Sequence, residues 1–126
     1  MVRRFYAQAW NRWDDSVLPQ LLDPGFTFRG SLGDEVRGHD GWRAYRDRIR
    51  AAVPDFLNEI TDLVVEGDRA AARLRYSGHH HGELLGVRGD GRRVEYAGAA
   101  FFTARAGLLT AAWVLGDLDA LRRQLP

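Results

Sequence analysis

Apolar residues in the first half of the chain recur every three or four positions, which is the spacing of an amphipathic helix. Residues 2–13 carry one such apolar stripe, and residues 15–22 carry a shorter one. Asp15 and Ser16 offer N-caps to this second helix. A third stripe runs from about residue 40 to residue 53 and stops at a proline. The pattern therefore predicts three N-terminal helices.

The second half of the chain alternates between apolar and polar residues and is broken by turns that contain glycine, which is typical of antiparallel strands. Turns at residues 67–68 and 106–107 each join two alternating runs. A short strand at 26–28 precedes a glycine-rich loop, and a short helix is expected after Asp117. The four main strands are expected at residues 56–66, 69–81, 92–105 and 108–116.

These elements predict an α+β fold in which a curved antiparallel sheet is covered by the three N-terminal helices, with a short C-terminal helix at its end. The covered face of the sheet should enclose an apolar pocket for a small organic molecule. The pocket walls are expected from aromatic and aliphatic residues that face inward on the helices and strands. They are Trp10, Tyr45, Phe56, Tyr96, Ala100, Phe102 and Val114.

The last two expected strands are also apolar on their second face, which the helices cannot cover. A monomer would expose this face as a large patch, so we predict a homodimer that forms through the outer face of the sheet. A terminus or long loop lying over the face is the alternative. The residues assigned to this face are Ala97, Ala99, Phe101, Leu109, Ala111, Trp113 and Leu115.

Length and composition narrow the classes of protein that fit. The 126 residues suffice for one hydrophobic core, so a single domain spanning 1–126 is expected. The chain has no cysteine, and no apolar run approaches the ~20 residues of a membrane span, so a cytoplasmic protein without membrane contact is expected. The net charge is only +1, whereas nucleic-acid binding requires concentrated positive charge. Nucleic acid is therefore not an expected partner.

Short motifs occur along nearly the whole chain, namely Gly38, Gly41, Val53-Pro54-Asp55, Gly67-Asp68, Gly78, His80, Gly82, Gly86, Gly91-Arg92-Arg93-Val94, Gly107, Trp113, Asp117 and Arg123-Gln124-Leu125. Taken in this order, they resemble the SnoaL-like polyketide cyclases (ester cyclases). The resemblance implies the nuclear-transport-factor-two-like fold, a cone of curved sheet closed by helices and also described as an α+β barrel. The fold serves enzymes and binding proteins alike, so it does not decide the function.

The resemblance implies a reaction without a cofactor, in which a polyketide ester closes a ring by intramolecular aldol condensation in secondary metabolism. A pocket orients the chain while a carboxylate moves a proton from carbon. In these cyclases the acid/base aspartate and its histidine partner occupy the positions of Val114 and Ala100 here. Neither residue can carry a proton, so the family's mechanism does not transfer intact.

His80 and Asp117 are the candidate catalytic residues that remain. His80 shares the inward face with Tyr76 and matches a family histidine, although it could instead fix the end of a strand. Asp117 lies near the family's active region but would also make a good N-cap. Asp62 is a second candidate carboxylate, and Tyr96 could donate a hydrogen bond to an enolate oxygen. No metal is expected, because consecutive histidines on a strand face opposite sides.

Three functions fit these residues. The first is a cyclase or related enzyme that transfers protons in a small apolar or polyketide-like substrate. The second is a relative that acts on an epoxide or in hydroxylation, although no inward arginine supports epoxide hydrolysis. The third is a dimer that binds a small molecule without catalysis, which the apolar residues at positions 100 and 114 favour.

Overall fold

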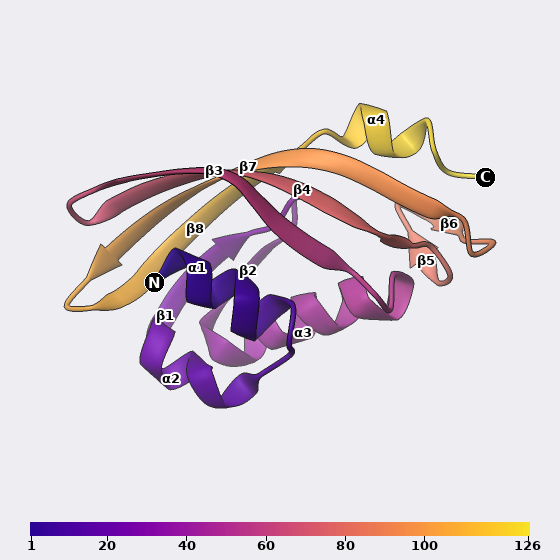
Figure 1. Ribbon diagram of the computed structural model, residues 1–126. Helices are drawn as coiled ribbons and strands as arrows, with labels where there is room; N and C mark the ends of the chain where they lie inside the picture. The colour runs from indigo at the N-terminus through magenta and orange to yellow at the C-terminus, as the bar shows by residue number, and fades with distance from the viewer.

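A six-stranded sheet curves over a layer of helices in the computed structural model, which describes residues 1–126 (Figure 1). This arrangement confirms the expected α+β class. The strands are β1 (Leu22–Arg29), β2 (Glu35–Arg37), β3 (Leu57–Glu66), β4 (Arg69–His79), β7 (Arg93–Arg105) and β8 (Leu108–Gly116), and the short pair β5 (Glu83–Leu84) and β6 (Val87–Arg88) forms a separate hairpin. The helices are α1 (Val2–Arg4), the π-helical turn η1 (Phe5–Trp10), the 3₁₀ turn η2 (Asp15–Val17), α2 (Leu18–Leu21), α3 (Gly38–Ala52) and α4 (Leu118–Arg122).

The sheet is mixed, not purely antiparallel as expected. Its strand order is β2-β1-β8-β7-β4-β3, and β1 runs parallel to β8 while every other pair is antiparallel. Tight turns force antiparallel pairing only between strands that they join directly, whereas α3 and three long strands separate β1 from β8. The two edge strands, β2 and β3, do not pair with each other, so the sheet stays open and does not close into a barrel.

The first helix is shorter than its apolar stripe. After α1 the chain widens into the π-helical turn η1, where the amide of Asn11 donates to the carbonyl of Tyr6. Trp13 then takes a positive φ of 59° and ends the segment. The N-cap of the next helical segment is Asp14, whose carboxylate accepts from the amide of Ser16, so the expected caps at Asp15 and Ser16 are off by one or two positions.

One residue of β8 lies on the opposite face of the sheet from the face expected. Leu109, assigned to the outer face, is buried inside the sheet because β8 contains a bulge beside the Thr103/Ala104 register shift. One extra residue in a strand moves all residues beyond it to the opposite face. The alternation expected for β7 holds, since Phe102 is buried and Phe101 is exposed.

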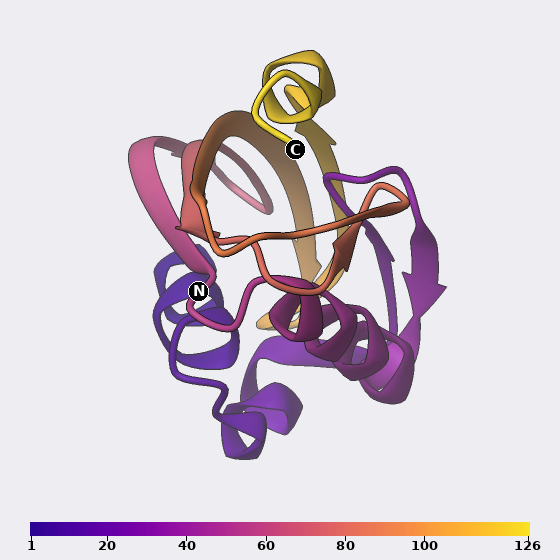
Figure 2. The ribbon, with the colours of Figure 1, turned by 90° about the vertical axis from the view of Figure 1, so that its right-hand side faces the viewer.

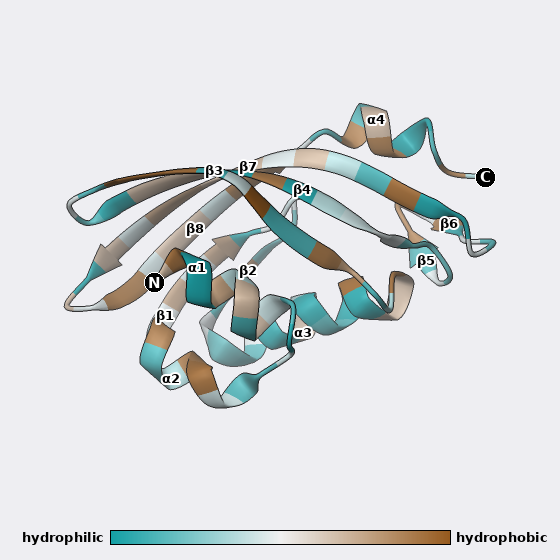
Figure 3. Ribbon diagram, viewed as in Figure 1, coloured by the Kyte–Doolittle hydropathy of each residue, from teal (hydrophilic) through white to brown (hydrophobic).

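The core lies between the sheet and the helices, and aromatic rings fill most of it. Phe5 is fully buried, and its ring lies 5.3 Å from that of Trp42 and 5.9 Å from that of Phe102, measured between ring centroids. Hydrophilic residues cover much of α3, while β8 is mainly neutral or hydrophobic (Figure 3). The hairpin β5–β6 and α4 lie at one end of the sheet, away from α1 and α2 (Figures 1 and 2). None of the helices combines the length and apolar composition that a membrane span requires.

Candidate functional site

A small cavity lies beneath the sheet, between the helical layer and the inner faces of β1, β3, β4 and β8. We call it the inner cavity. The space left between its walls has room for about one water molecule. A ligand larger than water therefore needs side chains to move. The inner cavity is lined by Tyr6, Trp10, Phe28, Ser31, Tyr45, Ile49, Phe56, Asn58, Tyr76 and Val114.

Four of the seven predicted wall residues line the inner cavity. The other three, Tyr96, Ala100 and Phe102, lie buried in the core beside it. Tyr96 still reaches the cavity wall, because its hydroxyl lies 3.1 Å from the hydroxyl of Ser31. Ala100 and Val114, the positions of the family's proton-transfer pair, are direct partners across β7 and β8.

All four tyrosines of the chain lie at or beside this cavity, and each comes from a different element. Tyr6 belongs to η1, Tyr45 to α3, Tyr76 to β4 and Tyr96 to β7, and none is more than 5% exposed. Tyr76 and Tyr96 are opposite each other on paired strands, with ring centroids 4.8 Å apart. Gly98 makes room for this pair, since an added Cβ would lie 2.7 Å from the Tyr76 hydroxyl.

The tyrosine hydroxyls are neutral, and most of them lack hydrogen-bond partners in the protein. Burial raises the pKa of Tyr6, and burial together with the neighbouring tyrosines raises that of Tyr76. Burial also raises the pKa values of Tyr45 and Tyr96, although contacts with Ser31 at both residues, and with the Leu32 backbone at Tyr45, partly offset the effect. The hydroxyl of Tyr45 is buried beside Ser31 without a well-formed hydrogen bond. The site therefore offers O–H donors and no charged group.

His80 is fully buried but is not among the residues that line the inner cavity. Its Nε2 lies 3.0 Å from the carbonyl oxygen of Val87 in the β5–β6 hairpin, so Nε2 donates to that oxygen, and Nδ1 is buried without a hydrogen-bond partner. Val53 fills the space beside Gly78, between the positions of Tyr76 and His80 along β4. His80 therefore links β4 to the hairpin, and its role in proton transfer stays a prediction.

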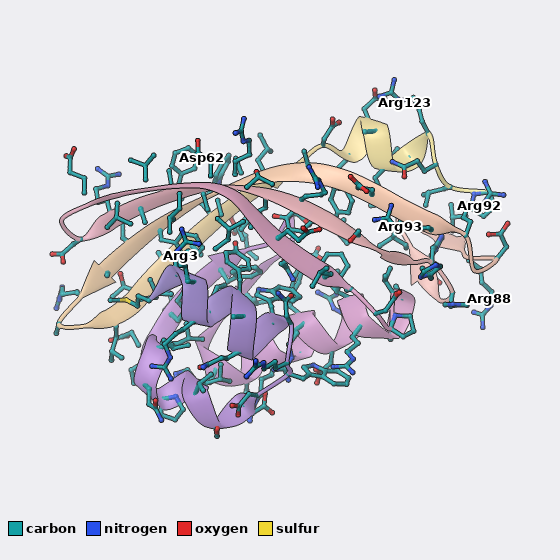
Figure 4. All side chains as sticks on the ribbon, viewed as in Figure 1. Arg3, Asp62, Arg88, Arg92, Arg93 and Arg123 are labelled. Carbon is teal, nitrogen blue, oxygen red and sulfur yellow. The ribbon has the colours of Figure 1, made fainter.

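Asp117 and Asp62 both lie outside the inner cavity. The carboxylate of Asp117 is exposed and accepts from the amide of Ala120, which makes it the N-cap of α4. Asp62 stands on the outer face of the sheet, away from the helices (Figure 4), and its carboxylate lies 3.9 Å from Arg73. Neither carboxylate could reach a substrate in the inner cavity without a change of fold, and a catalytic role for Asp117 stays a prediction.

The three consecutive histidines face alternate sides, as the strand geometry predicts. His79 is exposed and pairs with Asp55, whose carboxylate accepts from the His79 amide at 2.7 Å and contacts Nδ1 at 2.6 Å. Partial burial acts to raise the pKa of Asp55, but the bonds from His79 outweigh it and leave that pKa lowered. No group of three or more His, Cys, Asp or Glu side chains is arranged to hold a metal ion.

Several cavity residues gave little signal in the sequence. Ser31 lies in a glycine-rich loop, and Asn58 lies on β3, where apolar and polar residues do not alternate regularly. The amide of Asn58 is held by Asn11, whose side chain donates to the Asn58 carbonyl at 2.9 Å. The tyrosines were recognisable as inward-facing positions, but their convergence depends on contacts between elements far apart in the chain.

A family model described as SnoaL-like polyketide cyclase matches residues 1–125. TsrD of Streptomyces laurentii is 35% identical with a TM-score of 0.84, and the match covers 98% of this chain and 90% of TsrD. IdmH of Streptomyces antibioticus, a proposed polyketide cyclase, is 26% identical with a TM-score of 0.84 over 98% of this chain and 94% of IdmH. AclR of Streptomyces galilaeus, a proposed hydroxylase, is 28% identical with a TM-score of 0.78, and the match covers 95% of this chain and 74% of AclR. Comparison with curated protein sequences gives no significant match.

Proposed function

Because this chain belongs to the SnoaL-like polyketide cyclase family, we propose that it is a cofactor-free enzyme that closes a ring in a polyketide-like carbonyl compound. The substrate binds in the inner cavity after the aromatic walls part. The family's chemistry and the likeness to IdmH support a cyclisation in secondary metabolism.

The single observation that carries this proposal is the set of neutral tyrosine hydroxyls at the inner cavity. In an aldol ring closure a carbonyl oxygen gains negative charge as the adjacent carbon loses its proton. Hydrogen-bond donors already aimed at that oxygen lower the barrier most in a site that excludes water. Tyr76 fits this role, since burial keeps its hydroxyl protonated and the hydroxyl makes no hydrogen bond within the protein. Tyr45 is also buried and protonated, but its hydroxyl lies beside Ser31 and the Leu32 backbone.

The overall ring closure neither consumes nor releases a proton. The proton that leaves the carbon next to the carbonyl is regained by the alkoxide that forms when the ring closes, so the product is an isomer of the substrate. A carbon between two carbonyl groups is acidic enough for a weak base once a donor stabilises the enolate. The Nδ1 of His80 has no hydrogen-bond partner in the protein, and it meets the substrate only after the β5–β6 hairpin shifts.

A second function, binding without catalysis, is favoured by one specific observation. The inner cavity is lined by neither a carboxylate nor an imidazole, and the family's proton-transfer positions are Ala100 and Val114. A protein of this kind would hold a carbonyl ligand through the same tyrosines. Turnover separates the two functions, because a binding protein retains the ligand unchanged.

We expect Tyr76→Phe to lower the kcat for ring closure of a linear poly-β-keto ester by about 100-fold. The change removes one donor to the enolate oxygen and keeps the ring that fills the core. Chromatographic separation of linear and cyclised isomers measures the rate, and the free energy of unfolding shows whether the fold is intact.

Two further variants serve as controls for the Tyr76→Phe result. Tyr96→Phe should lower kcat less than Tyr76→Phe does, because the Tyr96 hydroxyl is already hydrogen-bonded to Ser31. Asp117→Asn should leave kcat unchanged, since asparagine caps a helix as well as aspartate does. An unchanged rate in Tyr76→Phe would refute the tyrosine proposal, and a large loss in Asp117→Asn would restore that carboxylate as a catalytic group.

We also propose that two copies of the chain pair through the outer face of the sheet. Phe101 and Trp113 are 56% and 45% exposed there and lie beside a hollow of 880 Å³. Arginines and glutamates border this hollow together, so the surface carries both charges that a two-fold contact with itself requires. The bordering charged residues are Arg29, Glu35, Arg37, Glu66 and Arg69.

We expect the protein to be a dimer by light scattering at micromolar concentration and Phe101→Arg to make it a monomer. The substitution places a charge in the centre of the proposed contact. Val65→Arg is the matched control, because Val65 is 65% exposed but lies beside a different hollow near the N-terminus. A monomeric wild type, or equal effects of the two arginines, would contradict the dimer.

A further inference from the structure

A second hollow lies outside the inner cavity, between η1, the end of α3 and the start of β3. We call it the vestibule; its volume is about 350 Å³. Trp10, Ile49 and Phe56 line both spaces and form the partition between them. The vestibule therefore adjoins the inner cavity across these three side chains.

Opening the partition requires the rings of Trp10 and Phe56 to move apart. These rings lie 5.9 Å apart between centroids at a tilt of 49°, and Trp10 also packs against Trp42 at 5.4 Å. Trp10 is the last residue of the π-helical turn, and turns of this type often occur at functional sites. The backbone on both sides is fixed, because Asn11 and Asn58 exchange hydrogen bonds of 2.9 and 3.0 Å.

Three of the four polar residues that line the vestibule already have partners. The side chain of Asn11 is bound to Asn58. The guanidinium of Arg46 lies 2.6 Å from the carboxylate of Asp15 and donates to the carbonyl of Ala9. The Asp55 carboxylate faces His79. Arg50 is the exception.

Arg50 has a guanidinium with neither an ion pair nor a hydrogen bond in the structure, and an aromatic ring holds it in place. The guanidinium carbon lies 3.1 Å from the centroid of the Trp13 ring. Trp13 is itself fixed, since its indole N–H donates to the carboxylate of Asp47 at 3.0 Å. A stacked guanidinium keeps its planar fork of donors ready for an anion and loses little freedom on binding.

We propose that Arg50 binds a carboxylate of the ligand, while the ligand's carbonyl end passes the partition and reaches the tyrosines of the inner cavity. This inference rests on the proposed carbonyl-binding function and adds the substrate class, an acidic keto compound. The apolar partition separates the two polar ends, which suits a ligand with an acid at one end, a ketone at the other and an apolar segment between them. Asp55 also lines the vestibule, but His79 occupies both of its oxygens.

The test compares an acid with its neutral ester. The probes are 7-oxooctanoate and its methyl ester, which share a ketone at one end of an apolar segment and differ in the carboxylate charge at the other end. Isothermal titration should show the acid binding about tenfold more tightly than the ester, in line with one charge-assisted bidentate contact. Arg50→Gln should remove this preference and leave the ester's affinity unchanged. Added salt should weaken the binding of the acid and leave the binding of the ester unchanged.

Arg105→Gln is the matched control, because it removes the same charge at the far end of β7. Its affinity for the acid should equal that of the wild type. Equal binding of acid and ester to the wild type, or an equal loss in both arginine variants, would overturn the role of Arg50. If the ester still binds and Tyr76→Phe weakens it, the carbonyl-binding function survives that result. If neither the acid nor the ester binds, both the role of Arg50 and the carbonyl-binding function are overturned.

Discussion

Phe102→Ala is expected to lower the free energy of unfolding by about 3 to 5 kcal/mol. The Phe102 ring is 2% exposed and meets the rings of Phe5 and Tyr6 edge-on at 5.9 and 6.0 Å between centroids. Its removal leaves a cavity that the sheet cannot close, since β7 is paired on both sides. Urea unfolding monitored by tryptophan fluorescence measures the loss.

The neighbouring residue provides the control for this prediction. Phe101 has the same side chain on the opposite face of β7 and is 56% exposed. Phe101→Ala should change the stability of the monomer by only about 0.5 kcal/mol. If the proposed dimer forms, the effect of Phe101→Ala should grow with protein concentration, because association stabilises the folded state. Similar losses for the two alanine variants at high dilution would contradict the assigned faces of β7.

The second large effect is expected at alkaline pH. Burial raises the pKa values of all four tyrosines, so none should ionise in the folded protein near the ordinary value of about 10. In the unfolded chain the tyrosine hydroxyls lose their protons at about pH 10. Because the folded state holds them more tightly, its stability is complete below about pH 10 and falls as the pH rises above that value.

Spectroscopy can follow this transition directly. Tyrosinate absorbance should stay flat until the protein unfolds and then rise in one step that coincides with the loss of circular dichroism. Acetyltyrosine amide, which titrates at the ordinary pKa, supplies the reference curve. Tyrosinate that forms gradually at about pH 10 while the protein is still folded would show that the hydroxyls reach water and that the inner cavity is open.

Local patterns identified most of the elements but not how they pair. The alternation along β7 separated Phe101 from Phe102 because successive side chains on a strand point to opposite faces. The same rule misplaced Leu109, since a bulge in β8 leaves no mark in the alternation of a strand rich in apolar residues. The parallel pairing of β1 with β8 was also missed, because it joins segments more than eighty residues apart.

The candidate site was predicted less completely than the fold. The sequence pointed to an apolar pocket and to Trp10, Tyr45, Phe56 and Val114 in its wall, and these four residues line the inner cavity. Asp117 was a candidate both as a cap and as a catalyst, with the cap slightly favoured, and its exposed side chain accepts from the Ala120 amide as a cap does. Arg50 gave no signal, because its significance depends on which neighbouring groups already have partners.

The sequence by itself determined most of the apolar positions that are buried, the α+β class and, through the order of its motifs, the family. These properties follow from helical and strand periodicity and from short turns, all of which act over a few residues. Only the tertiary structure decided that four tyrosines from η1, α3, β4 and β7 meet around one cavity and that aromatic rings nearly fill it. The curvature of the sheet and its long-range pairing set those distances, and no local pattern encodes them.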